Sequence, residues 1–197
     1  MMPDLGVSRA LVLQGPAGPF MRRFGEELRA GGIEVTKINF HVGEVLFCRG
    51  PAAIAYRGSR EDWPAFVREL MIARRIDGLF VFGDCRPLHA AAIREARELG
   101  ARVFVLEEGY LRPNWITLEE HGVNGNSKMP RDPDYYRRLD LPEVEPPFEV
   151  GERWQQMAWY STFSALAFTH LNQGFPHYEH HRNLNAWYHT FTNLRSV

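Results

Sequence analysis

The chain of 197 residues is long enough for one domain, or for one domain with an extension. Apolar residues make up 45% and charged residues 24%, which supports a packed core and excludes wholesale disorder. The formal net charge of −1 argues against a nucleic-acid partner, because such partners favour basic domains.

Cysteine usage and hydropathy indicate a compartment. Cys48 and Cys85 are too few for a disulfide framework, and no charged-then-apolar leader opens the chain. We therefore expect a cytoplasmic protein. No stretch approaches the ~18 consecutive apolar residues of a membrane span, so at most a peripheral contact with the inner membrane is predicted.

Strand-like and helix-like patterns alternate from residue 10 to residue 106. Short apolar or alternating runs predict strands at 10–14, 34–40, 52–56, 78–82 and 102–106. Helical spacing, with proline or glycine at the boundaries, predicts helices at 20–30, 63–75 and 87–99. This alternation predicts an α/β fold with a doubly wound parallel sheet of the Rossmann-like type.

The remainder of the chain has a different composition. We assign residues 1–139 to the Rossmann-like domain, 140–150 to a Pro/Glu linker, and 151–197 to an aromatic-rich helical extension. An amphipathic helix is predicted at 152–171, and another helix after Arg182. The aromatic side chains of the helix at 152–171 are compatible with packing over a sheet, with a partner-binding face or with a membrane-binding face. A membrane-binding helix would favour basic residues on its opposite face, and this segment lacks them.

The densest group of reactive side chains follows the last predicted strand, in Phe104-Val-Leu-Glu-Glu-Gly-Tyr-Leu-Arg-Pro113. Open α/β sheets bind ligands beyond the carboxyl ends of their strands, which places Glu107, Glu108, Tyr110 and Arg112 in such a crevice. A carboxylate there can accept a proton, and an arginine can hold a phosphate or a carboxylate. The same residues also fit a polar turn with a surface ion pair.

A glycine-rich loop lies between the first predicted strand and the first predicted helix. Gly15 and Gly18 in Gly15-Pro-Ala-Gly-Pro19 would let an anionic ligand approach the backbone at a helix N-terminus. The pattern matches neither the dinucleotide nor the Walker fingerprint. A plain tight turn fits it equally well.

Residues 83–89 connect the fourth predicted strand to the third predicted helix. Asp84, Arg86 and His89 would lie near the crevice; alternatively, Asp84 caps the helix and His89 is an ordinary surface residue. Cys85 lies beside Arg86, which would lower the pKa of its thiol, but no base partner for a nucleophilic cysteine is evident.

Histidines are frequent near the C-terminus. They lack the spacing of H-E-x-x-H or paired C-x-x-C motifs, so no metal site is predicted. The histidines concerned are His177, His180, His181 and His189.

Several motifs occur in the order found in bacterial capsule polysaccharide biosynthesis proteins. They are Leu13-Gln-Gly-Pro-Ala-Gly-Pro-Phe20, Ile38-Asn-Phe40, Phe82-Gly-Asp-Cys-Arg-Pro87, Glu107-Glu-Gly-Tyr-Leu-Arg-Pro113, Gly122-Val-Asn-Gly-Asn-Ser127 and Pro176-His-Tyr-Glu-His-His-Arg-Asn-Leu-Asn185. The chain thereby resembles this family nearly throughout, in particular its single-module members that act on the lipid terminus of the capsule chain.

The resemblance implies a β-Kdo glycosyltransferase of GT-B-like architecture. Such members transfer Kdo from CMP-Kdo, the donor substrate, to a lyso-phosphatidylglycerol acceptor at the inner face of the cytoplasmic membrane; no further cofactor is implied. Inversion at the anomeric carbon needs a general base, and the motif implies Glu108 first and Glu107 second. Arg86 and Arg112 would pair with the acceptor phosphate or the Kdo carboxylate. The remaining implied cleft residues are Gly15, Gly18, Asn124 and Asn126.

The sequence also departs from the family pattern. Members carry a second α/β domain with a His-Pro motif and a nucleotide-binding surface, and nothing here matches it. We therefore expect an acceptor-side half that is inactive alone, with a phospholipid acceptor and other capsule biosynthesis and export proteins as partners. Two alternatives are a non-catalytic binding or assembly module of that machinery and a small hydrolase using Asp84 or Cys85.

Overall fold

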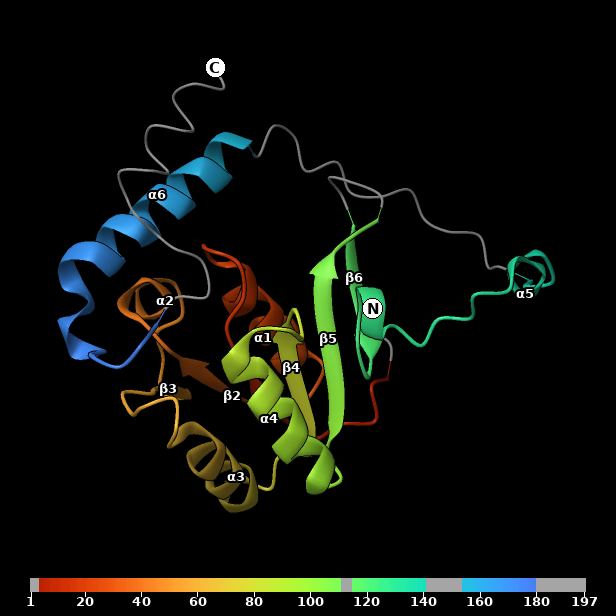
Figure 1. The fold of residues 1–197 in the computed structure, drawn as a ribbon, viewed down its shortest axis with the longest axis horizontal. Helices are drawn as coiled ribbons and strands as arrows, with labels where there is room; N and C mark the ends of the chain where they lie inside the picture. Colours follow the sequence, from red (N-terminus) through yellow and green to blue (C-terminus); the bar gives the residue numbers. More distant parts are fainter. Residues whose placement is uncertain (1–3, 111–114, 141–153, 180–197) are drawn as a thin grey trace.

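A six-stranded sheet forms the centre of the computed structural model, which describes residues 4–110, 115–140 and 154–179 (Figure 1). Its order is β3-β2-β1-β4-β5-β6, with the first five strands parallel and β6 antiparallel to β5. The strands are β1 (Arg9–Val12), β2 (Glu34–Asn39), β3 (Ala53–Ala55), β4 (Gly78–Phe82), β5 (Arg102–Glu108) and β6 (Ile116–Glu120).

Helices cover both faces of this sheet. α1 packs on one face through Met21 and Leu28, and α3 and α4 pack on the other through Trp63 and Ala92. The doubly wound arrangement predicted from the sequence is therefore confirmed. The helices are α1 (Phe20–Ala30), α2 (Val42–Phe47), α3 (Trp63–Arg74), α4 (Pro87–Glu98), α5 (Pro133–Arg137) and α6 (Trp154–Leu171), with short 3-10 turns η1 (Asn124–Asn126) and η2 (Asn172–Gly174).

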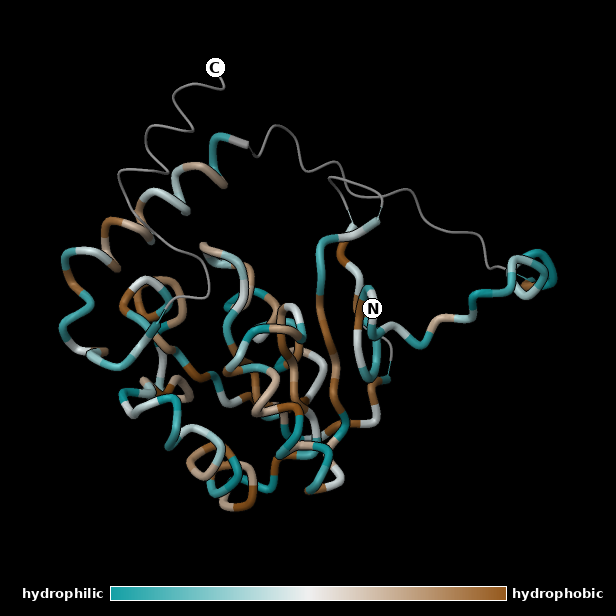
Figure 2. The backbone as a smooth tube through the Cα atoms, viewed as in Figure 1, coloured by the Kyte–Doolittle hydropathy of each residue, from teal (hydrophilic) through white to brown (hydrophobic). Residues whose placement is uncertain are grey.

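The central strands are buried on both faces, as their continuous apolar runs predict. Side chains alternate along each strand, so Leu79 and Val81 lie on the α3/α4 face while Phe80 and Phe82 lie on the α1 face. β4 and β5 are among the most apolar stretches of the chain trace (Figure 2). The same alternation in β5 fixes which way its last residues point.

The prediction that the last strand ends at Leu106 and is the final strand was wrong. β5 continues through Glu107 and Glu108, which pair in register with Thr117 and Ile116 of β6. β6 was missed because it is an edge strand whose apolar side chains remain partly exposed, with Ile116 46% accessible. Burial therefore imposes no clear alternating pattern on its sequence.

A second unpredicted element is the short helix α2. His41 caps it, because its Nδ1 accepts a hydrogen bond from the Gly43 amide at 3.1 Å. Glu44 reaches back and accepts from the Phe40 amide at 2.8 Å. Histidine is not among the preferred N-cap residues, so no helix start signal precedes this segment.

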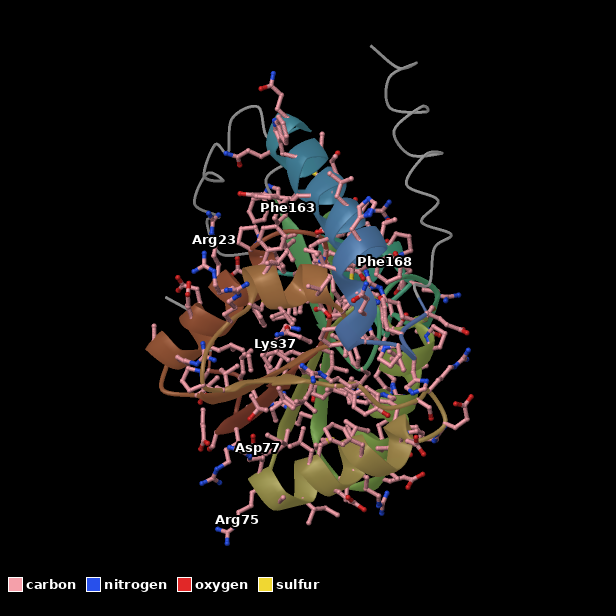
Figure 3. The ribbon with its side chains drawn as sticks, turned by 90° about the vertical axis from the view of Figure 1, so that its left-hand side faces the viewer. Arg23, Lys37, Arg75, Asp77, Phe163 and Phe168 are labelled. Carbon is pink, nitrogen blue, oxygen red and sulfur yellow. The ribbon has the colours of Figure 1, made fainter. Side chains whose placement is uncertain are left out.

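α6 packs against α2. Phe47 meets the rings of Tyr160 and Phe163 edge-on, with centroids 5.4 and 6.1 Å away. Figure 3 shows Phe163 and Phe168 on the long helix that lies over the domain. α6 contains no Asp, Glu, Lys or Arg, and it leaves other large apolar side chains in solvent, including Trp159 at 74% exposure.

Other sequence expectations concern segments outside the described residues. These are most of the predicted linker and the helix predicted after Arg182. Within the part of the chain that the structure describes, no helix has the length and apolar character needed to cross a membrane.

Candidate functional site

A cavity of about 230 Å³ opens at the carboxyl ends of the parallel strands. Gln14 follows β1 and Arg86 precedes α4, and β1 and β4 are the neighbouring strands from which the chain leaves in opposite directions. This topological switch point is the usual ligand site of an open α/β sheet. We call this cavity the strand-end pocket; its lining residues are Gln14, Phe40, Tyr56, Arg57, Gly58, Ser59, Arg60, Arg86, Pro87, Leu88, His89, Phe175, His177, Tyr178 and Glu179.

Positive charges outnumber negative ones in the lining of this pocket. Arg57, Arg60 and Arg86 contribute three positive charges, against one carboxylate from Glu179. Arg57 lies over the Phe175 ring, 5.8 Å from its centroid. Within the described residues, Arg57 and Arg60 form no ion pair with a carboxylate. The pocket therefore suits an anionic group.

The segment 175–179 forms one wall, and Tyr178 anchors it. Gln14 donates its side-chain amide to the Tyr178 hydroxyl at 2.8 Å. The Tyr178 ring stacks on His41 at 5.0 Å between centroids and on Phe40 at 6.4 Å. Burial raises the pKa of Tyr178 far above its ordinary value, so this phenol stays protonated and serves as a structural anchor.

His41, beneath that ring, is held neutral. Burial lowers its pKa, the charges of Lys37 and Arg86 lower it further, and Glu44 opposes them. A neutral imidazole can accept the Gly43 amide at Nδ1, as the α2 cap requires. Lys37 and Glu44, two of the charges that act on this pKa, form a buried ion pair at 2.9 Å.

Asp84, a predicted substrate-binding residue, joins the end of β4 to the η1 turn. Its Oδ2 accepts hydrogen bonds from the Asn126 side chain at 3.0 Å and from the Val123 amide at 3.3 Å. Partial burial raises the carboxyl pKa, but hydrogen bonds from Asn126, Cys85 and Val123 outweigh it and leave the pKa below its ordinary value. Two predicted site residues, Asp84 and Asn126, are thus brought together; the other predicted η1 residue, Asn124, is exposed with a φ of 54°.

The expected lowering of the Cys85 pKa was wrong. Its thiol lies 3.2 Å from Asp84 Oδ1 and donates to it, so this hydrogen bond and the Asp84 charge raise the thiol pKa. A raised pKa disfavours the thiolate that nucleophilic catalysis requires. The geometry therefore gives no support to a hydrolase built on Asp84 or Cys85.

His89 and Arg86 both line the strand-end pocket. His89 is fully buried, and its Nδ1 lies 2.8 Å from the Gly83 carbonyl oxygen, so it is not the ordinary surface residue of the alternative interpretation. Arg86 donates to the Gly15 carbonyl oxygen at 3.4 Å. That contact links the glycine loop to the start of α4.

The two predicted glycines have packing roles. A Cβ on Gly15 would meet Met21 Cγ at 2.2 Å, and one on Gly18 would meet the Tyr160 ring at 2.7 Å. Gly18 also has a φ of 112°, which favours glycine. α1 therefore packs against one side of the glycine loop and α6 packs against another.

Glu107 and Glu108 point to opposite faces of the sheet. Glu107 shares the parity of Val105, on the α3/α4 face, whereas Glu108 shares the parity of Leu106, on the α1 face. The pocket residues Phe40 and Tyr56 belong to the α3/α4 face. Glu107 therefore shares the pocket's side of the sheet.

The other predicted residues of this motif lie beyond the strand. Tyr110 is 65% exposed, and Arg112 lies outside the described residues. Among the described residues, no group of three histidine, cysteine, aspartate or glutamate side chains is arranged to hold a metal ion.

Sequence reasoning missed Arg57, Arg60 and the 175–179 wall. The loop Arg57-Gly-Ser-Arg60 follows β3, so the strand-end rule applied to Glu107 could also have found these arginines. No comparable signal exists for Tyr178, because its partner Gln14 is 164 residues away.

The sequence of this chain is similar to those of known capsule proteins. Residues 77–195 match the family described as "Capsule polysaccharide biosynthesis protein". The chain belongs to this family. Its membership supports a role in capsule polysaccharide biosynthesis and confirms the resemblance drawn from the motifs.

Individual relatives agree with that membership. The chain is 38% identical over 190 residues to the capsule polysaccharide export protein KpsS of Escherichia coli, covering 93% of this chain and 47% of KpsS. It is 35% identical over 182 residues to the capsule polysaccharide modification protein LipB of Neisseria meningitidis serogroup B, covering 89% and 43%. The chain therefore spans about half the length of these relatives.

Solved structures give a more distant likeness. A UDP-glucose 4-epimerase of Thermotoga maritima, solved with UDP-glucose, matches with a TM-score of 0.40 and 15% identity, covering 82% of this chain and 52% of the epimerase.

Proposed function

We propose that this chain is the acceptor-side part of a capsule-lipid Kdo transferase. In this reaction an acceptor hydroxyl of lyso-phosphatidylglycerol attacks the anomeric carbon of Kdo, the bond to CMP breaks, and CMP leaves with its phosphate. A side-chain carboxylate accepts the proton of the attacking hydroxyl. Family membership and the names of KpsS and LipB support the capsule context.

The observation that carries the proposal is the pairing of a cationic strand-end pocket with a carboxylate on the same side of the sheet. Arg57, Arg60 and Arg86 suit the phosphate of the acceptor, since a guanidinium binds phosphate oxygens in two-pronged fashion. Glu107 extends toward the end of β4, where its Oε2 would be 3.7 Å from a Cβ at Gly83. One acceptor molecule would thus place its phosphate in the pocket and its attacking hydroxyl near Glu107.

The two glutamates differ as candidates for the base. The family motif favours Glu108, whereas the alternation of side chains along β5 favours Glu107 for a ligand in the strand-end pocket. In this structure Glu107 Oε1 also accepts the Glu108 amide at 3.1 Å, which orients its carboxylate. We place Glu107 first on geometry and keep Glu108 as the direct comparison.

The test uses the protein at the length its own cells produce. It is incubated with CMP-Kdo and lyso-phosphatidylglycerol, and the Kdo-lipid is quantified by mass spectrometry. General-base removal lowers rates by roughly 10²–10⁴-fold, so Glu107→Gln should fall in that range. Glu27→Gln, an exposed glutamate on α1, is the matched control and should retain the wild-type rate. Absence of Kdo transfer by the wild-type protein when a donor-side part is present would reject the proposal.

A non-catalytic assembly module is the second candidate, favoured by the exposed apolar side chains of α6. Trp159 is 74% exposed and Met157 58% exposed, a surface suited to another capsule protein. Such a module would support capsule assembly equally well with Glu107→Gln and Glu108→Gln. Capsule production in cells carrying both substitutions separates the two functions.

A further inference from the structure

We infer that the strand-end pocket is a phosphate-binding subsite that takes a small phosphate ester. Arg57 and Arg60 would bind the phosphate together with Arg86, and the aromatic wall would contact the organic part. The biological source of the ester rests on the proposed function, whereas phosphate binding rests on the pocket itself.

The loop that carries two of the arginines is held in place by its own contacts. The Tyr56 hydroxyl donates to the Ser59 carbonyl oxygen at 2.6 Å, and the Ser59 hydroxyl donates to Asp62 at 2.7 Å. A Cβ on Gly58 would meet the Tyr56 hydroxyl at 2.6 Å, so the loop folds closely over that ring. Its backbone is therefore ordered before a ligand arrives, which lowers the entropic cost of binding.

A helix N-terminus adds to the cationic character. α4 begins at Pro87, no described side chain caps it, and its first turn carries no acidic residue. Leu88 and His89, in that first turn, line the pocket. The N-terminal end of a helix carries a partial positive charge and attracts phosphate. The helix end and three arginines thus line one cavity.

Size and charge define the class of ligand. The cavity of about 230 Å³ lies below the ~300–1,000 Å³ of pockets for drug-sized ligands, so a small ester fits better than a whole nucleotide-sugar. A ligand with a single carboxylate would not pair with all three arginines, whereas a phosphate offers three oxygens to them. Phe40 and Phe175 supply apolar contact for a short carbon chain.

Binding is measured by calorimetry on the full chain, with glycerol 3-phosphate as the probe and glycerol as the neutral control. The double variant Arg57→Gln/Arg60→Gln should weaken the affinity at least about tenfold, and Arg86→Gln by a similar factor. Arg75→Gln is the matched control. Arg75 precedes β4, at the end of the strands opposite the pocket, and it lies far from α6 in Figure 3. Circular dichroism checks that each variant is folded.

Further probes identify the source of the phosphate. Inorganic phosphate, CMP and vesicles containing anionic phospholipid are compared, and the probe with the largest arginine-dependent binding is the source. Arginine-dependent phosphate binding without Kdo transfer would uphold this subsite and reject the transferase. Kdo transfer with unchanged affinities in all arginine variants, or no binding of any probe, would overturn the subsite.

Discussion

Tyr178 is the residue whose removal tests most directly whether the segment 175–179 is part of the folded domain. Its hydroxyl accepts from the amide of Gln14, which is 5% exposed, and its ring lies against His41 and Phe168. Tyr178→Phe keeps the ring and leaves the Gln14 amide without this partner. An unsatisfied buried polar group costs about 1–3 kcal/mol, so we expect a loss near the lower end of that range.

Tyr178→Ala removes the ring as well. Aromatic-to-alanine substitutions in cores cost about 3–5 kcal/mol, and because Tyr178 is only partly buried we expect ~2–3 kcal/mol. The affinity for glycerol 3-phosphate should fall in Tyr178→Ala and change little in Tyr178→Phe, since only the former removes the wall of the pocket.

Urea unfolding followed by tryptophan fluorescence measures these losses. Tyr135→Ala on α5 is the control; its ring is 46% exposed and meets only the Tyr136 ring among the described aromatic residues, so the free energy of unfolding should change by less than ~0.5 kcal/mol. Equal unfolding free energies for Tyr178→Ala and wild type would refute the idea that the segment packs on the sheet.

Other substitutions test the structure beneath and beside the pocket. The folded pKa of His41 lies below its unfolded value of 6.5, so only the unfolded chain binds the proton as the pH falls below 6.5. The free energy of unfolding should therefore drop by up to ~1.4 kcal/mol per pH unit. His41→Asn keeps a capping acceptor and should flatten that part of the pH profile. Lys37→Met should lower the free energy of unfolding by ~3 kcal/mol, because it leaves Glu44 buried without its cation. Adding Glu44→Gln should recover part of that loss, as measured by urea unfolding. Strictly additive effects of the two substitutions would argue against the buried pair. Gly18→Ala and Gly32→Ala both place a Cβ on a residue with a positive φ, but only the Cβ at Gly18 would contact a ring of α6. The Tm of Gly18→Ala should therefore fall at least ~2–4 °C further than that of Gly32→Ala. Equal shifts would contradict that packing.

Periodicity was sufficient to predict the parallel core from the sequence. Buried strands such as β4 and helices bounded by proline, such as α4, carry local signals that tertiary contacts did not override. The site depends on longer-range pairing. Asp84 meets Asn126 across 42 residues, a contact that no local pattern encodes. Likewise, the faces of Glu107 and Glu108 become defined only once β5 is known to continue beyond Leu106.

The strand-end pocket also links the parts into which the sequence divides the chain. Its cationic loop comes from the α/β domain, and its aromatic wall comes from 175–179, in the predicted extension. α6 lies between them in sequence and packs on α2, whose cap His41 contacts both Phe168 and Tyr178. A ligand in the pocket would thus contact the sheet and the extension together. Binding energy gained there would stabilise the packing of the extension on the domain, because a ligand that binds only the packed form favours it by mass action.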